Sequence, residues 1–366
     1  MMPVQQKTLI DKLYETQNLR REEFAALIAQ RTRDSAEYLF EKAREVQQSC
    51  YGKEVYIRGL IEFTNYCRND CYYCGIRMGN ENIPRYRLHF EEILERCKSG
   101  YELGFRTFVL QGGEDEYFTD ERLAYLIRSI RQAHPDCAIT LSVGERSRQS
   151  YQKYFDAGAD RYLLRHETAN EVHYRRLHPP NLSLKERIRC LYDLKEIGYQ
   201  VGTGFMVESP WQTPEYLAED MAFIKELSPQ MVGIGPFISH RDTPFCKMQS
   251  GTLELTLFMV GLLRLMLPEA LIPATTALGT IHPRGRELGI LAGANVVMPN
   301  LSPVEVRDKY MLYDNKISTG AEAAETLEEL RERVRTIGYQ VAVTRGDPVK
   351  PLQSGLCKAC EAVREG

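Results

Sequence analysis

Three cysteines near residue 70 are the side chains of this sequence best suited to chemistry. Cys67, Cys71 and Cys74 follow a C-x3-C-x2-C spacing, with Tyr73 directly before the last cysteine. A closed tetrahedral zinc site needs four ligands, so this segment would need a distant His or Cys to complete one. A cubane iron–sulfur cluster contains four irons, and three thiolates leave one of them open. The spacing therefore predicts a 4Fe–4S cluster with an iron that is free to bind a substrate or a cofactor.

This cysteine loop resembles the cluster-binding loop of radical S-adenosylmethionine (SAM) enzymes. The resemblance implies that the open iron binds the amino and carboxylate groups of SAM. It also implies that one electron from the cluster cleaves SAM to a 5'-deoxyadenosyl radical. Tyr73 lies between two cluster ligands, where its ring is placed to pack against adenine. We therefore expect two cofactors, one 4Fe–4S cluster and SAM, and a reducing electron donor as a partner.

The composition is that of a soluble globular protein. The 366 residues, 43% hydrophobic and 27% charged, suffice for one large domain or two modest ones. A net charge of −3 gives no electrostatic reason to expect nucleic acid or a membrane as a partner. The N-terminus has no apolar signal region, and the apolar stretch 255–263 is too short to span a bilayer. Ten cysteines are too few for a disulfide scaffold, so we expect a cytoplasmic protein.

Short apolar runs alternate with helical patterns along most of the chain. Eight such βα units predict an α/β protein with a complete (β/α)8 TIM barrel. The expected strands are residues 55–63, 105–110, 138–143, 160–164, 200–206, 231–235, 270–274 and 294–298. The helical patterns cover residues 91–103, 119–133, 184–197, 213–227 and 253–267. We expect a helical N-terminal extension at 1–50, the barrel at 51–315, and a C-terminal helix with a flexible tail at 316–366.

Polar and glycine residues gather after these strands, where the active sites of such barrels lie. Gln111, Gly112, Gly113 and Glu114 follow the second expected strand, and Ser142 ends the third. The two glycines allow close backbone approach because neither has a Cβ. We expect Glu114 to accept a hydrogen bond from the SAM ammonium group, as in the similar glycine-glycine-glutamate motif of radical SAM proteins.

The end of the fourth expected strand carries an arginine and a carboxylate. Arg165 and Glu167 alternate along an extended chain, so both should point the same way. Burying them is costly unless they are paired or hold a ligand. We interpret Arg165 as a clamp for a carboxylate and Glu167 as a partner of the ribose or amine, with a salt bridge between them as the alternative. Arg187 either neutralises the SAM carboxylate or is a surface arginine, and Arg58 faces either the lumen or the helix shell. His166 is interpreted as a packing or hydrogen-bonding residue.

Four longer segments resemble HydE, the family of radical SAM maturases of FeFe-hydrogenase. They are residues 61–67, 162–170, 232–238 and 272–277, in the family's order and spacing, within a likeness that runs from about residue 50 to about residue 313. The resemblance implies a complete barrel with SAM at the top of an internal cavity. It further implies that the radical acts on an iron–carbonyl–cyanide–cysteine complex supplied by a partner maturase.

The resemblance also assigns individual residues. The cluster ligands are Cys67, Cys71 and Cys74. The positions that match SAM contacts are Gln111, Gly112, Gly113, Glu114, Ser142, Glu167 and Arg187. The positions that match the substrate cavity are Arg165, Thr275, Thr276, Met298, Tyr310 and Tyr313.

The sequence departs from the family in two regions. Some members carry a second cluster on cysteines shortly after the region of Tyr310 and Tyr313, but residues 316–321 contain none and continue into an amphipathic helix that ends near residue 337. We therefore expect no second cluster there. Cys357 and Cys360 form a C-x2-C pair near the C-terminus, and two thiols alone close neither a cluster nor a zinc site. Glu208 and Trp211 replace small residues of the family pattern, which leaves the shape of the loop after the fifth strand open.

Two other radical SAM families offer alternative functions on small amino-acid-type substrates. Biotin synthase needs further cysteines at strand ends for a sulfur-donating cluster, and here those positions are Gly112 and Ser142. Methylornithine synthase also lacks a second cluster and is the better alternative. A protein of a different class, an iron–sulfur scaffold or electron carrier without SAM chemistry, can be distinguished from these enzymes by one observation. Only a radical SAM enzyme yields 5'-deoxyadenosine from SAM when the protein is reduced.

Overall fold

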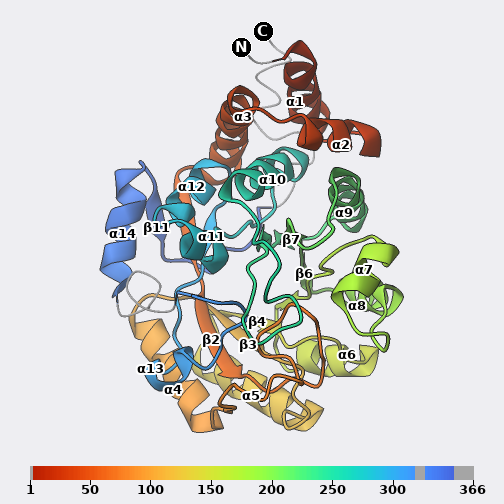
Figure 1. Cartoon of the computed structure of the whole chain (residues 1–366). Coiled ribbons are helices and arrows are strands. Elements are labelled where there is room, and N and C mark those ends of the chain that lie inside the picture. The colour runs from red at the N-terminus through yellow and green to blue at the C-terminus, as the bar shows by residue number, and fades with distance from the viewer. Residues whose placement is uncertain (1–2, 318–325, 350–366) are drawn as a thin grey trace.

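Short parallel strands alternate with helices in an α/β fold (Figure 1). The structure, a computed structural model, describes residues 3–317 and 326–349. Its largest sheet has six strands in the order β2-β3-β4-β5-β6-β8, and every neighbouring pair is parallel. These strands are β2 (Gly59–Thr64), β3 (Thr107–Gly112), β4 (Ala138–Ser142), β5 (Arg161–Leu163), β6 (Gln200–Thr203) and β8 (Met231–Val232).

Two smaller parallel sheets complete the strand layer. One has the order β10-β1-β11 and the other pairs β7 with β9. Their strands are β1 (Glu54–Ile57), β7 (Met206–Val207), β9 (Gly235–Pro236), β10 (Val296–Val297) and β11 (Gln340–Ala342). Isolated parallel bridges join Met231 to Leu271, Pro273 to Val296 and Leu60 to Asn300. These bridges connect the edge of the large sheet at β8 with β10, and the region after β10 with β2.

Helices surround the strands and cover their outer side (Figure 1). They are α4 (Phe90–Glu102), α5 (Asp120–Ala133), α6 (Arg148–Asp156), α7 (Glu171–Leu177), α8 (Leu184–Ile197), α9 (Pro214–Leu227), α10 (Leu253–Met266), α11 (Thr276–Ile281), α12 (Gly285–Leu291), α13 (Val304–Arg307) and α14 (Leu327–Thr336). Several begin at a Ser, Thr or Asn whose side-chain oxygen accepts a backbone N–H of the first turn, which fixes where the helix starts. Thr119, Ser147, Asn170, Thr213 and Thr252 act in this way.

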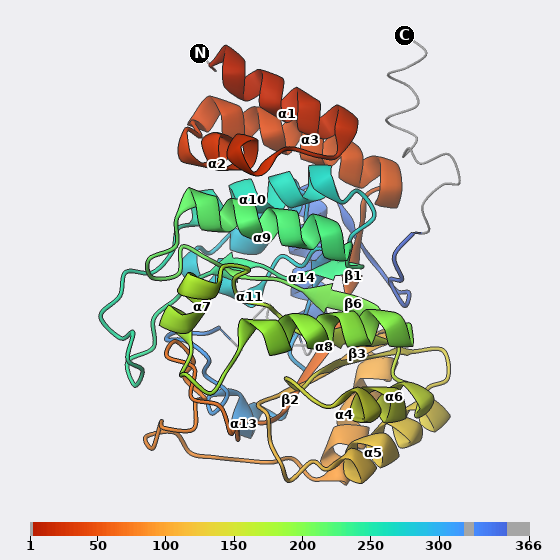
Figure 2. The ribbon, with the colours of Figure 1, turned by 90° about the vertical axis from the view of Figure 1, so that its right-hand side faces the viewer.

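The N-terminal helices form a separate layer on one side of the strands. α1 (Val4–Thr16), α2 (Arg21–Ala29) and α3 (Arg33–Tyr51) pack on α9 and α10 (Figure 2). α10 is therefore covered from two directions, and nearly all of its residues are buried. This explains its sequence, because a helix that is apolar on all sides is stable only when it is buried all round. Within the described part of the chain, none of the helices has both the length and the apolar character needed to cross a bilayer.

The expected strands are found at the right places, but most are shorter or divided. Residues 55–63 divide at Arg58 into β1 and β2, which pair with different neighbours. Residues 200–206 and 231–235 each divide into two short strands, and residues 270–274 form only isolated bridges. The five expected helices are confirmed to within one residue at each end. The short helices α6, α7, α11, α12 and α13 were not expected, because runs of four to nine residues give little periodicity.

The C-terminal segment corrects the expected domain plan. α14 confirms the helix over its described residues, but residues 340–349 are not a flexible tail. β11 pairs in parallel with β1, and the following residues bind Arg161, which is fully buried at the start of β5. The Arg161 guanidinium donates to the carbonyls of Arg345 and Gly346, and to Asp347 Oδ1 at 2.8 Å. A buried arginine needs such acceptors, and this requirement holds the segment in place. Residues 357 and 360 lie outside the described residues.

Two truncations test this role of residues 340–349. A chain that ends at Gly338 removes β11 and three acceptors of Arg161. Removing the partner of a buried charge costs about 3–5 kcal/mol, so the unfolding temperature of a chain of this length should fall by about 4–7 °C. A chain that ends at Gln353 keeps these contacts and should unfold at the parent temperature with unchanged iron content and SAM cleavage. Equal stability of the two truncated chains in a thermal melt would contradict this assignment.

Candidate active site

All of the predicted site residues line one cavity at the C-terminal ends of the strands. Its volume is about 350 Å³, a size typical of small-molecule sites. The predicted residues on its wall are Cys67, Cys71, Tyr73, Cys74, Gln111, Gly112, Gly113, Glu114, Ser142, Arg165, Glu167, Arg187, Thr275, Thr276, Met298, Tyr310 and Tyr313. The cavity thus unites residues that are separated by almost 250 positions in the sequence.

The three cysteines of the loop after β2 are free thiols on the cavity wall. Burial raises the pKa of each thiol, for Cys74 to about 12, and neighbouring sulfurs raise the pKa of Cys71 and Cys74 further. Three thiolates this close would need positive charge beside them, which the irons of a cluster supply. Gly113 lets the loop approach, because a Cβ there would stand 2.2 Å from the Tyr66 carbonyl oxygen and 2.6 Å from Cys67 Cβ.

The arrangement of the cysteines fits a cluster. No group of three His, Cys, Asp or Glu side chains in residues 3–317 and 326–349 surrounds the position of a single ion. In a cubane, each cysteine binds a different iron at a different corner, so the thiols need not converge on one point. Cys67 Sγ also accepts a hydrogen bond from the Asn69 N–H at 3.4 Å, and such bonds to sulfur stabilise thiolate ligands.

Glu114 links the cluster loop to the loop after β4 by hydrogen bonds. Its carboxylate accepts from Arg68 Nε at 3.0 Å and from the Glu145 N–H at 2.8 Å, and its carbonyl accepts the Arg68 N–H. Gly144 is required beside it, since a Cβ there would lie 2.1 Å from Glu114 Cγ. The carboxylate reaches the cavity as predicted, but it is already engaged by the protein.

Arg165 and Glu167 both reach the cavity, but from a turn and not from the extended chain that was expected. β5 ends at Leu163, and Glu167 has a φ of +65°, so the chain turns and is not extended. Arg165 Nη2 lies 3.0 Å from Glu167 Oε2, which is an ion-pair distance. The two groups are not aligned as a hydrogen bond, and Arg165 Nε and Nη2 and Glu167 Oε2 have no hydrogen-bond partner within the described chain. The salt-bridge alternative is therefore present, yet both groups keep capacity for a ligand.

A buried histidine between them holds this turn. His166 Nδ1 lies 2.8 Å from Thr203 Oγ1, and its Nε2 lies 3.2 Å from Asp220 Oδ1 on α9. Asp220 also accepts the Ala169 N–H. Burial lowers the pKa of His166 to about 3, so the imidazole is neutral, and burial raises the pKa of Asp220 well above its usual value. The interpretation of His166 as a hydrogen-bonding residue is confirmed.

Arg187 is a buried residue of the wall, so the surface alternative is wrong. Its Nε pairs with Glu145, and its Nη1 donates to the Arg165 carbonyl at 2.7 Å. Burial alone would lower the pKa of Arg187, but the Glu145 carboxylate raises it well above its usual value. Tyr73 is held on the cavity wall by its hydroxyl, which lies 3.2 Å from His178 Nε2.

The remaining predicted residues form the wall nearest β9, β10 and the segment after them. Thr275 is the residue before α11, and its hydroxyl is buried without a partner among the described residues. Tyr310 is buried, and its hydroxyl contacts Gln111. Tyr313 contacts Thr280, which is on α11. The unpartnered Thr275 hydroxyl, with the free capacity of Arg165 and Glu167, leaves polar groups of both signs for a charged ligand such as SAM or an anion.

Three further charged residues line the wall: the sequence left the side of Arg58 open, and it did not indicate Glu62 or Lys316. Lys316 Nζ donates to Glu62 Oε1 at 2.6 Å and to the Tyr310 carbonyl at 3.0 Å, and both charged side chains are buried. Arg58 also lines the cavity, which decides its side of the strand. Residues 58, 60 and 62 share one face by their spacing of two, so this alternation was a usable signal for Glu62. No sequence pattern marks Lys316.

Comparison with known proteins agrees with this site. The profile of the Radical SAM superfamily matches residues 61–224. The [FeFe] hydrogenase maturase subunit HydE of Thermotoga maritima is 46% identical over 311 residues, which cover 85% of this chain and 88% of that protein. The chain belongs to the HydE family. It is accordingly a radical SAM enzyme, and members of that superfamily carry a 4Fe–4S cluster and bind SAM.

Methylornithine synthases are more distant relatives of this HydE-family chain. The 3-methylornithine synthase of Methanosarcina acetivorans is 30% identical over 300 residues, 81% of this chain and 84% of its own length. The crystal structure of methylornithine synthase (PylB) superposes with a TM-score of 0.78 and 27% identity, and covers 91% of this chain and 97% of that one. Enzymes with different names therefore share this fold. Any difference between their reactions must arise from the side chains that line the cavity.

Replacement of one cluster cysteine tests the metal assignment. Anaerobically reconstituted parent protein should bind close to the four irons of one cubane. Cys71→Ala should lose most of this iron and the spectral change caused by SAM, while Cys50→Ala, near the end of α3 in the N-terminal helical layer, should keep both. Iron analysis and absorption spectra provide the measurement. A Cys71→Ala protein with a full, SAM-responsive cluster would refute the assignment.

Removal of the two site carboxylates tests SAM binding. A hydrogen bond to a charged group contributes about 1.5–3 kcal/mol, so Glu167→Ala should weaken SAM binding by roughly tenfold to a hundredfold. Glu114→Ala should have a comparable effect, partly because Arg68 and the Glu145 N–H lose their acceptor. Equilibrium binding of SAM and the yield of 5'-deoxyadenosine are measured. Parent-like values in both variants would mean that SAM binds elsewhere.

Proposed function

We propose that this chain performs the HydE step in assembling the active-site cluster of FeFe-hydrogenase. The observation that carries the proposal is the single cavity, which unites the cluster cysteines with the predicted SAM and substrate residues. The 46% identity to the Thermotoga maritima maturase supports the same conclusion. The direct test is co-expression of an FeFe-hydrogenase with the other maturases and with this chain in place of their own HydE. Restored hydrogenase activity is expected, and its absence would count against the proposal.

We infer that the strands close into a complete (β/α)8 barrel at about residues 51–315, after a helical extension at 1–50. The bridges of Leu271, Pro273 and Asn300 support closure, because they continue the parallel pairing from β8 past β10 to β2. Closure would make the cavity an internal lumen that is open only at the cluster end. Residues 340–349 would then lie at the opposite end, beneath Arg161.

The chain would hold one 4Fe–4S cluster on its three cysteines, and the bound cluster and SAM together supply a carbon-centred radical to the cavity. Glu167 would accept hydrogen bonds from SAM, since its Oε2 has no hydrogen-bond partner in the described residues. Arg187, paired with Glu145, would orient the Arg165 backbone and so place both wall residues. Tyr73 would pack against the ring system of SAM from the cluster loop.

The substrate would be an iron–carbonyl–cyanide–cysteine complex, which is anionic. Arg165 offers two unoccupied N–H groups to its carboxylate. Deeper in the cavity, Arg58 has Met231 Sδ as its one hydrogen-bond acceptor among the described residues, at 3.0 Å. Burial lowers the pKa of Arg58, which shows how poorly its charge is compensated. An anionic substrate would supply the missing negative charge.

The alternative is a methylornithine synthase-like reaction on a small amino acid, which the 30% identity and the shared fold favour. An amino acid substrate needs partners for both an ammonium and a carboxylate. Incubation of the reduced enzyme and SAM with a mixture of free amino acids separates the two candidates, because the alternative predicts 3-methylornithine among the products and the HydE assignment predicts none.

The proposed partners are a reducing electron donor and the other hydrogenase maturases, and we propose that the enzyme acts in the cytoplasm. Free thiols beside a labile cluster suit a reducing compartment. Neither nucleic acid nor a membrane is among the proposed partners.

Substitution of Arg165 tests the anion clamp. A guanidinium holds a carboxylate by two parallel hydrogen bonds, which lysine cannot reproduce. Displacement of reacting groups by about 1 Å can cost about a hundredfold in rate. Arg165→Lys should therefore keep its cluster and SAM binding but fail to mature hydrogenase in the co-expression assay. Normal maturation would refute the clamp, and loss of the cluster or of folding would show that Arg165 is a structural partner of Glu167.

A further inference from the structure

Aromatic and basic side chains form a patch on the rim of the cavity, beside the cluster loop. This rim patch consists of Tyr72, Arg176, Trp211, Phe245 and Lys247. Trp211 is 46% exposed, and its ring meets the ring of Phe245 at a centroid distance of 5.5 Å. Phe245 in turn contacts Tyr72, with centroids 6.1 Å apart. Two ring contacts therefore connect an exposed tryptophan with the residue that directly follows the second cluster cysteine.

The rim patch is firmly attached to the cluster loop. The Tyr72 N–H donates to the Leu177 carbonyl at 3.0 Å, which links the loop to the end of α7. Phe245 is buried in a small apolar cluster with Leu177, Met206 and Phe237, and this cluster is separate from the main core. A group that binds on the patch would therefore sit at a fixed position relative to the cluster ligands.

The conformation and exposure of Trp211 do not favour the stability of the fold. Its φ is +64°, and a non-glycine residue in this conformation costs about 1–3 kcal/mol. The large ring nevertheless stays half exposed, so it gains only part of its burial energy. Tryptophan and arginine are the residues that most often dominate the energy of protein interfaces. An exposed tryptophan in a strained loop, with an arginine beside it, has the character of a binding residue.

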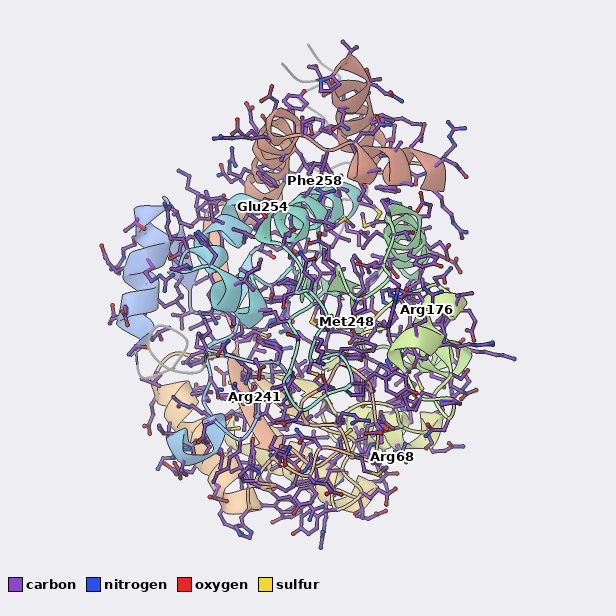
Figure 3. All side chains as sticks on the ribbon, in the orientation of Figure 1. Arg68, Arg176, Arg241, Met248, Glu254 and Phe258 are labelled. Carbon is purple, nitrogen blue, oxygen red and sulfur yellow. The ribbon has the colours of Figure 1, made fainter. Side chains whose placement is uncertain are left out.

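The charge of the rim patch is positive. Arg176 Cζ lies 5.7 Å from the Trp211 ring, and Lys247 is exposed two residues after Phe245. Neither side chain forms an ion pair with a carboxylate in the described part of the chain, whereas the neighbouring cations Arg175 and Arg241 do. Figure 3 shows Arg176, Arg241 and Met248 on the same face of the molecule. Arg176 lies beside the Trp211 ring and Lys247 follows Phe245 closely in the chain, so these two unpaired cations fit a negatively charged partner.

We propose that the rim patch is the docking surface for an acidic, low-potential one-electron carrier protein of the ferredoxin class. The inference rests on the proposed function, since a radical SAM cluster must receive an electron. In this step the carrier loses one electron and the cluster gains it, and no bond forms or breaks. Electron transfer falls steeply with distance, so the carrier must bind where the cluster loop is close to the surface. The rings of the patch provide that approach, and its cations attract the acidic carrier.

Binding is measured first, without turnover. Trp211 is the single tryptophan of the chain, so its fluorescence reports on the patch alone. The reconstituted protein is titrated with an oxidised, acidic ferredoxin that contains no tryptophan, and free tryptophan in a parallel titration corrects for absorbed light. We expect a saturable change that is lost at about 0.5 M salt. Arg176→Glu and Lys247→Glu should each weaken binding by about fivefold to tenfold, whereas Arg128→Glu, an exposed charge reversal on α5, should not.

Reduction of the cluster is measured second, with two reductants. Reduced ferredoxin should reduce the cluster of Trp211→Ala and Arg176→Glu several-fold more slowly than that of the parent. Dithionite, which needs no docking, should act equally on all of them and on Arg128→Glu. An unchanged fluorescence titration, or ferredoxin rates equal to the parent rate, would overturn the docking surface. Failure of the parent to cleave SAM with dithionite would instead refute the proposed function.

Discussion

Most charges buried in the wall of this cavity are compensated by other side chains, because taking an unpaired ion out of water costs several kcal/mol. Three ion pairs meet this condition, and each joins distant parts of the sequence. Lys316 reaches back to Glu62 on β2, Arg187 on α8 reaches Glu145 after β4, and Arg68 reaches Glu114 after β3. The pairs thereby decide where the loops lie. Lys316 also binds the Tyr310 carbonyl, and so it fixes the segment whose tyrosines close one side of the cavity.

The turn after β5 shows how this scaffold supports backbone strain. Glu167 has a left-handed conformation, which is unfavourable for a residue with a Cβ. The residues on either side anchor it, since the Glu167 N–H binds the Gly204 carbonyl and His166 is held by Thr203 and Asp220. Because burial keeps the His166 imidazole neutral, this anchor does not add a positive charge beside Arg165. The strained turn can therefore present Arg165 and Glu167 to the cavity without another counter-ion.

The sequence located the site better than it described the fold. Cysteine spacing, the glycine pair and polar residues after apolar runs are local signals, and all of these residues line the cavity. Strand lengths were overestimated because an apolar run continues through a bend, as at Arg58 between β1 and β2. The roles of Lys316 and of residues 340–349 depend on partners more than 180 positions away, Glu62 and Arg161. No local pattern contains that information.

Two residues of the loop after β7 have a backbone conformation that is unusual for their residue types. Glu208 and Trp211, which replace small residues of the family pattern, both have positive φ angles, the conformation that glycine adopts most easily. The loop therefore keeps the conformation that small residues would favour, at an energetic cost. Glu208 offsets part of this cost by accepting the Thr252 N–H and hydroxyl at the start of α10, at 2.5 Å each.

Because the fold is shared, the choice of substrate must depend on the side chains that line the cavity. Methylornithine synthase superposes over 91% of this chain, so the backbone cannot distinguish an anionic metal complex from an amino acid. The distinction must come from the side chains below the cluster. There, Glu62 is neutralised by Lys316 and accepts a hydrogen bond from Asn300, whereas Arg58 has no carboxylate partner among the described residues. The lower cavity thus has an uncompensated positive charge and a neutralised negative one. This imbalance favours an anion over a zwitterion, because an ammonium group would find no free carboxylate at that depth.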